Sequence, residues 1–137
     1  MINDRLYSYV EHGGYLPSYQ SGFRHNHSTI DHLVTIQQSA YAAFSKRESL
    51  VFVMLDIEKA YDSAWRAGIM ERLRNIGVGG KMYSWIRAFL TNRRSKVVLH
   101  GSVSGWLPAD YGVPQGSPLS PLLFNILIAP ALNKLSV

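Results

Sequence analysis

The run SLVFVMLDIEKAYDSAW, residues 49–65, joins an apolar half directly to a charged half. The apolar half is too short and too hydrophobic for a surface helix, so we expect a buried central strand over about 51–57. Asp56 would then lie where the strand ends, a position from which a carboxylate can ligate a hard cation such as Mg²⁺. A strand-end aspartate that only accepts neighbouring backbone N–H groups fits the same pattern, and from spacing alone that structural role is favoured.

The composition predicts one globular domain. The chain has 137 residues, of which 47% are hydrophobic, enough to bury a sizeable core. No apolar stretch is long enough to cross a membrane, and the amino terminus lacks the layout of a signal peptide. Cysteine is absent, which excludes disulfides and thiolate metal sites. We therefore expect an intracellular protein with no membrane partner.

The net charge of +5 is unevenly distributed. Between positions 66 and 96 the only acidic residue is Glu71, against eight basic ones. Such a zone suits a polyanion, because each neutralised phosphate releases counterions. A solvated helix face accounts for it equally well. The basic residues are Arg66, Arg72, Arg74, Lys81, Arg87, Arg93, Arg94 and Lys96.

Hydrophobic periodicity and turn residues predict an α+β order of elements. Ser28 with Asp31 is typical of a capping pair, Gly77 of a helix stop, and Asp62 and Ser120 of helix N-caps. Pro130 is expected to kink or end the last helix. The expected elements are a helix over about 28–45, the strand, a helix within 62–77, another over about 80–91, a β-hairpin within 95–113, and a helix from about 120.

A second stretch, YGVPQGSPLSPLLFN at 111–125, combines backbone-stiffening and polar residues. Gly116 would let a flat ligand approach the main chain closely, and Gln115 offers both a donor and an acceptor beside it. A purely structural turn that leads into an apolar helix is the alternative.

Three segments together resemble a known family. LDIEKAYDSAW (55–65), here called the aspartate motif, resembles the first catalytic motif of reverse transcriptases. GVPQGSPLSPLLFNI (112–126), here called the PQG motif, resembles the motif that follows it in the polymerase palm. YQSGFRHNHSTIDHL (19–33) is similar to the segment before the palm strand in non-LTR retrotransposon and group II intron enzymes. Order and spacing fit the non-LTR type best, with a leaning toward the insect, jockey-type elements.

The resemblance implies a fold and a division of the chain. It implies a partial right-hand polymerase fold, with part of the fingers and an incomplete palm whose strand is packed by helices and accompanied by a β-hairpin. Residues 1–137 would form a single partial reverse transcriptase domain. About 1–50 would connect fingers to palm, and about 51–137 would be the incomplete palm.

The resemblance also implies roles for individual residues. Asp56 would be the first catalytic, metal-binding aspartate, with the Ile57 carbonyl helping to hold the second of two Mg²⁺ or Mn²⁺ ions. Tyr61 would be the steric gate that selects dNTPs, although its spacing alone suits a core tyrosine. The remaining implied positions are Pro114, Gln115 and Gly116 against the incoming nucleotide, Arg24 at phosphate or between fingers and palm, and Arg93, Arg94 and Lys96 on the template or primer backbone.

The implied activity is RNA-directed DNA polymerisation, with an RNA template, a DNA primer and dNTPs as partners. The family's second carboxylate motif, an Asp-Asp hairpin, has no counterpart, since no acidic residue follows Asp110. One carboxylate cannot neutralise two divalent ions, so we expect this chain by itself to be inactive. A non-catalytic nucleic-acid-binding remnant and a group II intron maturase-type enzyme are the alternatives. Tyr61 argues against an RNA-synthesising polymerase, which has no use for an aromatic gate.

Three histidines lie close together in sequence, at His25, His27 and His32. A zinc site would need more soft or nitrogen ligands than this chain offers nearby. Exposed or phosphate-facing histidines are the favoured interpretation.

Overall fold

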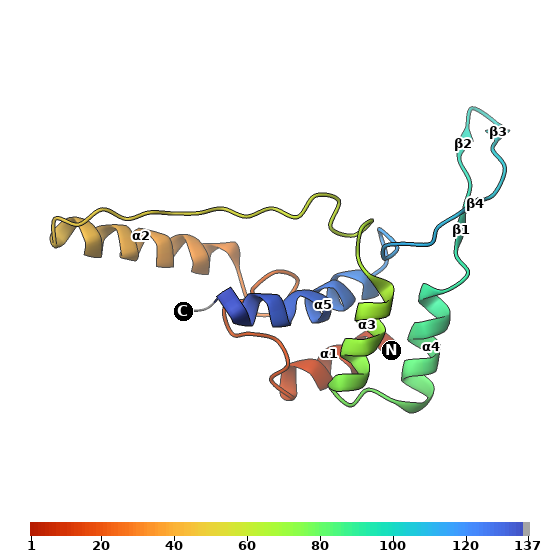
Figure 1. Ribbon diagram of the computed structural model, residues 1–137, viewed down its shortest axis with the longest axis horizontal. Helices are drawn as coiled ribbons and strands as arrows, with labels where there is room; N and C mark the ends of the chain where they lie inside the picture. The colour runs from red at the N-terminus through yellow and green to blue at the C-terminus, as the bar shows by residue number, and fades with distance from the viewer. Residues whose placement is uncertain (136–137) are drawn as a thin grey trace. The chain divides into compact units, whose positions relative to one another are not determined.

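The computed structural model describes residues 1–135, which form two compact units. The larger unit joins Met1–Pro17 to the chain from Glu58 onward, and the smaller unit is Ser18–Ile57. In the larger unit lie α1 (Ile2–His12), α3 (Arg66–Asn75), α4 (Gly80–Leu90), α5 (Leu119–Leu135) and four short strands, and in the smaller unit lies α2 (Thr29–Ser45) (Figure 1).

Four helices enclose the core of the larger unit. α3 contacts both α4 and α5, and α1 contacts α5. Each helix contributes apolar side chains that are removed from water, and burial of one such Leu or Ile stabilises the fold by about 1.5–3 kcal/mol. The buried helix residues are Leu6 and Val10, Ile69 and Leu73, Ile86 and Leu90, and Leu119, Leu122, Leu123, Ile126 and Ala129.

A glycine turn ends α3 and directs the chain into α4. Gly77 has a φ of +86°, and its N–H donates to the Arg74 carbonyl at 2.9 Å. The Val78 N–H donates to the Leu73 carbonyl at 2.8 Å, which completes a Schellman motif. The expected stop at Gly77 is confirmed.

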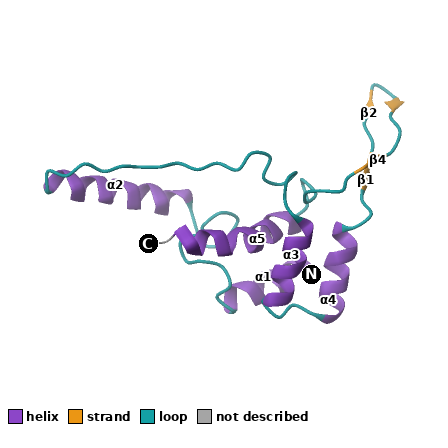
Figure 2. Ribbon diagram, in the orientation of Figure 1, coloured by secondary structure: helices purple, strands orange, loops and turns teal. Residues whose placement is uncertain are grey.

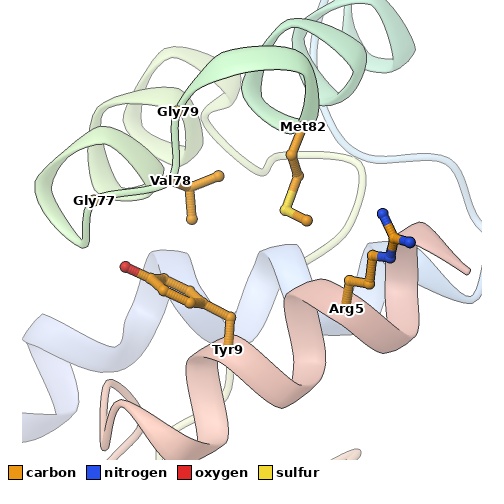
Figure 3. A pocket seen from close by; sticks show the side chains of 6 residues that line it. All are labelled: Arg5, Tyr9, Gly77, Val78, Gly79 and Met82. Carbon is orange, nitrogen blue, oxygen red and sulfur yellow. The ribbon is translucent and has the colours of Figure 1, made fainter.

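Tyr9 ties α1 to this turn. Its hydroxyl donates to the Ile76 carbonyl at 2.7 Å, and Figure 3 shows its ring reaching toward the turn from α1. A small pocket of about 260 Å³ opens beside this contact. It is lined by Arg5, Tyr9, Gly77, Val78, Gly79 and Met82.

The expected hairpin is present. β1 (Arg94–Ser95) pairs antiparallel with β4 (Leu107–Pro108), and β2 (Val98–Leu99) with β3 (Ser102–Val103). The two-residue turn His100–Gly101 has positive φ angles of 46° and 81°, as a type I′ turn requires. All eight paired residues are exposed.

α2 begins as expected at a capping box. The Ile30 N–H donates to Ser28 Oγ at 3.1 Å, and the Ser28 N–H donates to Asp31 Oδ2 at 2.9 Å. Both bonds satisfy amides that the first helical turn leaves without partners. In the described chain α2 buries none of its side chains, and its apolar residues Leu33 and Phe44 are exposed.

The expectation of a buried palm strand over 51–57 is wrong for this structure. These residues belong to no helix or strand and appear as a loop in Figure 2. Val51 is 82% exposed and Met54 is 83% exposed. A strand persists only where a partner takes up its backbone hydrogen bonds and a covering layer takes up its side chains. Among residues 1–135 no strand pairs with this segment.

One detail of the last helix also differs from expectation. α5 begins at Leu119, so Ser120 lies inside the helix, and its Oγ donates to the Pro114 carbonyl at 2.6 Å. A shift of one residue at a helix start is common. Here, however, the Ser120 hydroxyl donates to a loop carbonyl, whereas an N-cap side chain would accept from an amide of the first helical turn. α5 also continues through Pro130 to Leu135, so the proline does not end it.

Helices with small antiparallel sheets confirm the α+β class at that level. In the described part of the chain no helix combines the length and apolarity needed to cross a membrane.

Gly77→Ala is expected to lower the free energy of unfolding by about 1–2 kcal/mol, the cost of a left-handed alanine. A Cβ at position 77 would also come within 2.9 Å of the Tyr9 hydroxyl oxygen. Urea denaturation followed by circular dichroism measures the change. Gly79→Ala is the matched control, because its φ is −138° and no heavy atom lies within 4 Å of the added carbon. In a Tyr9→Phe background the Gly77→Ala loss should shrink, and an unchanged loss would contradict the contact.

Candidate functional site

The aspartate motif and the PQG motif meet in the larger unit, although about fifty residues separate them. The Val113 N–H donates to the Tyr61 carbonyl at 2.8 Å, and the Gly112 N–H donates to the Ala64 carbonyl at 3.1 Å. Arg66 adds side-chain bonds from its guanidinium to the carbonyls of Tyr111 and Gly112. These bonds hold the second half of the aspartate motif against the start of the PQG motif.

Gly112 makes this close approach possible. Its φ is +74°, and a Cβ there would lie 2.5 Å from the Tyr61 carbonyl oxygen and 2.6 Å from that of Asp62. Both obstacles are backbone atoms, which cannot turn aside as a flexible side chain would. Only glycine fits between the two segments.

The side chains of Asp62 and Gln115 extend this junction toward the solvent. Gln115 Nε2 donates to Asp62 Oδ1 at 2.9 Å, and both side chains are exposed. The expectation that Asp62 caps the following helix is wrong. α3 begins four residues later at Arg66, with Trp65 at the N-cap and no side-chain cap bond. The turn over residues 58–62 delays the helix and directs Asp62 to the PQG motif.

The PQG loop itself is anchored from one side and open on the other. Ser120 Oγ fixes the Pro114 carbonyl, as described above. Gly116 is exposed with a φ of +81°, and no heavy atom lies within 4 Å of where its Cβ would be. Space beside the main chain at Gly116 is what the close approach of a flat ligand requires.

A pocket of about 270 Å³ adjoins this loop. Two arginines, Arg66 and Arg93, share it with the Asp62–Gln115 pair. Burial lowers the pKa of Arg66, the repulsion of Arg93 lowers it further, and Asp110 acts in the opposite direction. The pocket is lined by Asp62, Arg66, Arg93, Ala109, Tyr111, Val113, Pro114 and Gln115.

Sequence reasoning counted Arg66 only as part of the basic zone and did not place Asp62 beside Gln115. Both assignments depend on contacts between segments about fifty residues apart. The one indication in the sequence was the spacing of Asp62 and Arg66, which lie four residues apart and can therefore face the same side of the chain.

Tyr61 is half-buried, and its ring packs edge-to-face against Phe124 of α5, with centroids 5.5 Å apart. Burial raises the pKa of the Tyr61 phenol above its ordinary value of 10.0. The folded state therefore favours the neutral phenol. This contribution to the free energy of unfolding is present below pH 10.0, and it is lost as the pH rises through the raised pKa of Tyr61. Tyr61 does not line the pocket of Arg66 and Arg93, here called the arginine pocket.

Asp56 and Ile57 lie in the smaller unit, in the exposed extended segment. A carboxylate and a backbone carbonyl are oxygen donors of the kind that Mg²⁺ prefers. Within residues 1–135 no three His, Asp or Glu side chains gather closely enough to hold a metal ion. The described donors therefore do not make up a two-metal set by themselves.

The remaining predicted residues have local partners. In the smaller unit, Arg24 Nη1 donates to the Gln20 carbonyl at 2.9 Å. In the larger unit, the Arg93 guanidinium lies 5.9 Å from the centroid of the Phe89 ring, and Lys96 Nζ lies 5.0 Å from that of Trp106. Arg94 is exposed on β1. Lys96 in the hairpin and Arg93 just before it thus each lie beside an aromatic face.

Comparison with known proteins agrees with the resemblance of the two motifs to reverse transcriptases. A family model described as reverse transcriptase (RNA-dependent DNA polymerase) matches residues 1–137. The chain is 30% identical over 137 residues to the RNA-directed DNA polymerase from mobile element jockey of Drosophila funebris, covering 100% of this chain and 15% of that protein. It is 31% identical over 124 residues to the probable RNA-directed DNA polymerase from transposon X-element of Drosophila melanogaster, covering 90% of this chain and 14% of that protein.

A more distant relative is the retrovirus-related Pol polyprotein from type-1 retrotransposable element R2 of Popillia japonica, 28% identical over 108 residues, with 79% of this chain and 18% of that protein covered. No solved structure matches the chain.

The chain belongs to the reverse transcriptase family. Its similarity to the jockey, BS and X-element polymerases confirms the expectation of a non-LTR retrotransposon reverse transcriptase domain. The chain spans only 14–15% of the length of these relatives.

Gly112→Ala is expected to cost clearly more stability than Gly116→Ala. Both glycines have positive φ, so both substitutions carry a left-handed cost of about 1–2 kcal/mol. Only Gly112 adds a clash with two carbonyl oxygens. The difference between the two free energies of unfolding, from urea titrations, isolates that clash. Equal losses would show that the two motifs do not approach each other this closely.

Proposed function

We propose that this chain contributes part of the fingers and palm of an RNA-directed DNA polymerase, and that it acts with an RNA template, a DNA primer and dNTPs. The observation that carries the proposal is the junction of the aspartate and PQG motifs through Gly112. This junction brings Tyr61, a half-buried aromatic residue, and Gln115, an exposed amide, to neighbouring backbone positions. An intracellular location accompanies this activity.

The proposed reaction extends a DNA strand by one nucleotide. The primer 3′ oxygen forms a bond to the α-phosphorus of the dNTP, the bond to the β-phosphate breaks, and pyrophosphate leaves. The hydroxyl proton passes to solvent. Divalent ions, Mg²⁺ or Mn²⁺, would stabilise the charge that develops on the phosphates. Asp56 and the Ile57 carbonyl would supply oxygen ligands for these ions.

The other residues would bind and select the nucleotide. Tyr61 would exclude a ribose 2′-hydroxyl, and Pro114, Gln115 and Gly116 would line the sugar and base. The open side of Gly116 supports this role, because a ring could lie against the main chain there. Arg24 is proposed to meet phosphate, for which a guanidinium is well suited.

Asp56→Asn in the full-length protein is expected to reduce primer extension on an RNA template by about a hundredfold or more. Ligation of a catalytic cation contributes several kcal/mol of transition-state stabilisation, and each 1.36 kcal/mol corresponds to about a factor of ten in rate. The assay follows extension of a labelled DNA primer with dNTPs and Mg²⁺. Glu58→Gln removes a nearby exposed carboxylate and should leave the rate unchanged. Full activity of Asp56→Asn would rule out its metal role.

A second candidate is a non-catalytic nucleic-acid-binding protein. It is favoured by the exposed hairpin, where Lys96 lies beside the Trp106 ring, and by the absence of any acidic residue between Glu71 and Asp110 in the sequence. The similarity to polymerases named from mobile elements favours the retrotransposon type over an intron maturase.

Replacing Arg94 and Lys96 together by Gln is expected to weaken RNA binding and to reduce the slope of log K against log salt by about 1.5. Each lost phosphate contact releases one fewer counterion. Fluorescence anisotropy at several salt concentrations measures the slope. Lys46→Gln with Arg47→Gln removes the same charge outside the basic zone and should not change it. Equal slopes for both double variants would exclude the hairpin as a phosphate-binding surface.

A further inference from the structure

The bond between Asp62 and Gln115 fixes how the amide of Gln115 is presented. A carboxylate only accepts hydrogen bonds, so the Gln115 nitrogen Nε2 must face Asp62, as the 2.9 Å distance shows. The other polar atom of the amide, Oε1, is then an acceptor on an exposed side chain. Without Asp62, the amide could turn over and exchange its donor and acceptor at little cost.

Both ends of this bond are held by the backbone. Tyr61, next to Asp62, accepts the Val113 N–H, and the Asp62 carbonyl lies against Gly112. On the other side, Pro114 precedes Gln115 with a ring-fixed φ, and its carbonyl accepts from Ser120. The two side chains therefore start from positions that are already fixed, so the bond costs little additional ordering.

The pocket beside the pair identifies the chemistry of the ligand. Arg66 and Arg93 line it, and two guanidinium groups in one pocket of about 270 Å³ suit a phosphate. Gln115 Oε1 adds an acceptor, which requires a donor on the ligand. A nucleotide has both parts, a phosphate and a hydroxyl or amino donor.

We propose that Asp62 is the positioning residue of the nucleotide site: it holds the Gln115 amide so that Oε1 accepts a hydrogen bond from the nucleotide. This inference rests on the proposed function. It assigns Asp62 a role separate from Asp56, since Asp62 acts through Gln115 and not through a metal ion.

Kinetics of single-nucleotide incorporation by the full-length protein test the proposal. Asp62→Asn keeps the shape of the side chain but can bond to either end of the amide. It is expected to raise KM for the dNTP about tenfold and to change kcat less than twofold, because a charge-assisted bond that orders the ground state is lost. Glu58→Gln is the matched control, an exposed carboxylate of the same aspartate motif that lies outside the pocket, and its KM should equal that of the wild type.

A double-mutant cycle separates positioning from stability. In a Gln115→Met background, where no amide remains to be oriented, Asp62→Asn should have no further effect on KM. A tenfold effect that persists in this background, or an unchanged KM for Asp62→Asn in an otherwise active enzyme, would overturn the proposal alone. An inactive wild-type protein would instead overturn the proposed function.

The Gln115 side-chain amide also reports on the bond directly, without any activity. In nitrogen–proton NMR spectra of the 137-residue chain, Asp62→Asn should move the two amide proton signals of Gln115, and Glu58→Gln should leave them in place. Signals that do not respond to Asp62→Asn would show that the carboxylate does not hold the amide.

Discussion

The site depends on one backbone contact, the approach of Gly112 to the carbonyls of Tyr61 and Asp62. The Gly112 and Val113 N–H groups donate the two hydrogen bonds that close the contact, and the Arg66 guanidinium donates to the Gly112 carbonyl. The missing Cβ allows two segments far apart in sequence to act as one surface. The arginine pocket, the orientation of Gln115 and the packing of Tyr61 on Phe124 all depend on this contact.

Local features of the fold could be predicted from the sequence because their causes are local. The Ser28 capping box, the glycine stop at Gly77 and the hairpin within 95–113 each depend on residues close to one another in the sequence. The family motifs indicated Tyr61 and Gln115 by resemblance, and the roles implied for them stay predictions. What the sequence could not predict was which motif residues contact each other, because that depends on how helices α3 and α5 pack.

Two of the wrong expectations have one physical cause. The apolar run 51–57 indicates what a segment would bury, but a strand forms only when a partner accepts its backbone bonds, and none of the described strands does. Asp62 has the residue type of a helix cap, yet it bonds to Gln115. In both cases the local preference of the sequence was overridden by contacts distant in sequence. The strand had no pairing partner among the described residues, and Asp62 had a partner in Gln115.

The order of synthesis sets when this core can close. The larger unit is assembled from two separate pieces of chain, and α1 packs against α5, the last helix described. As the chain emerges from the ribosome, α1 therefore cannot complete its packing until α5 has been made. α1 is made before the helix that covers part of its apolar face, and that part of α1 stays exposed during the interval.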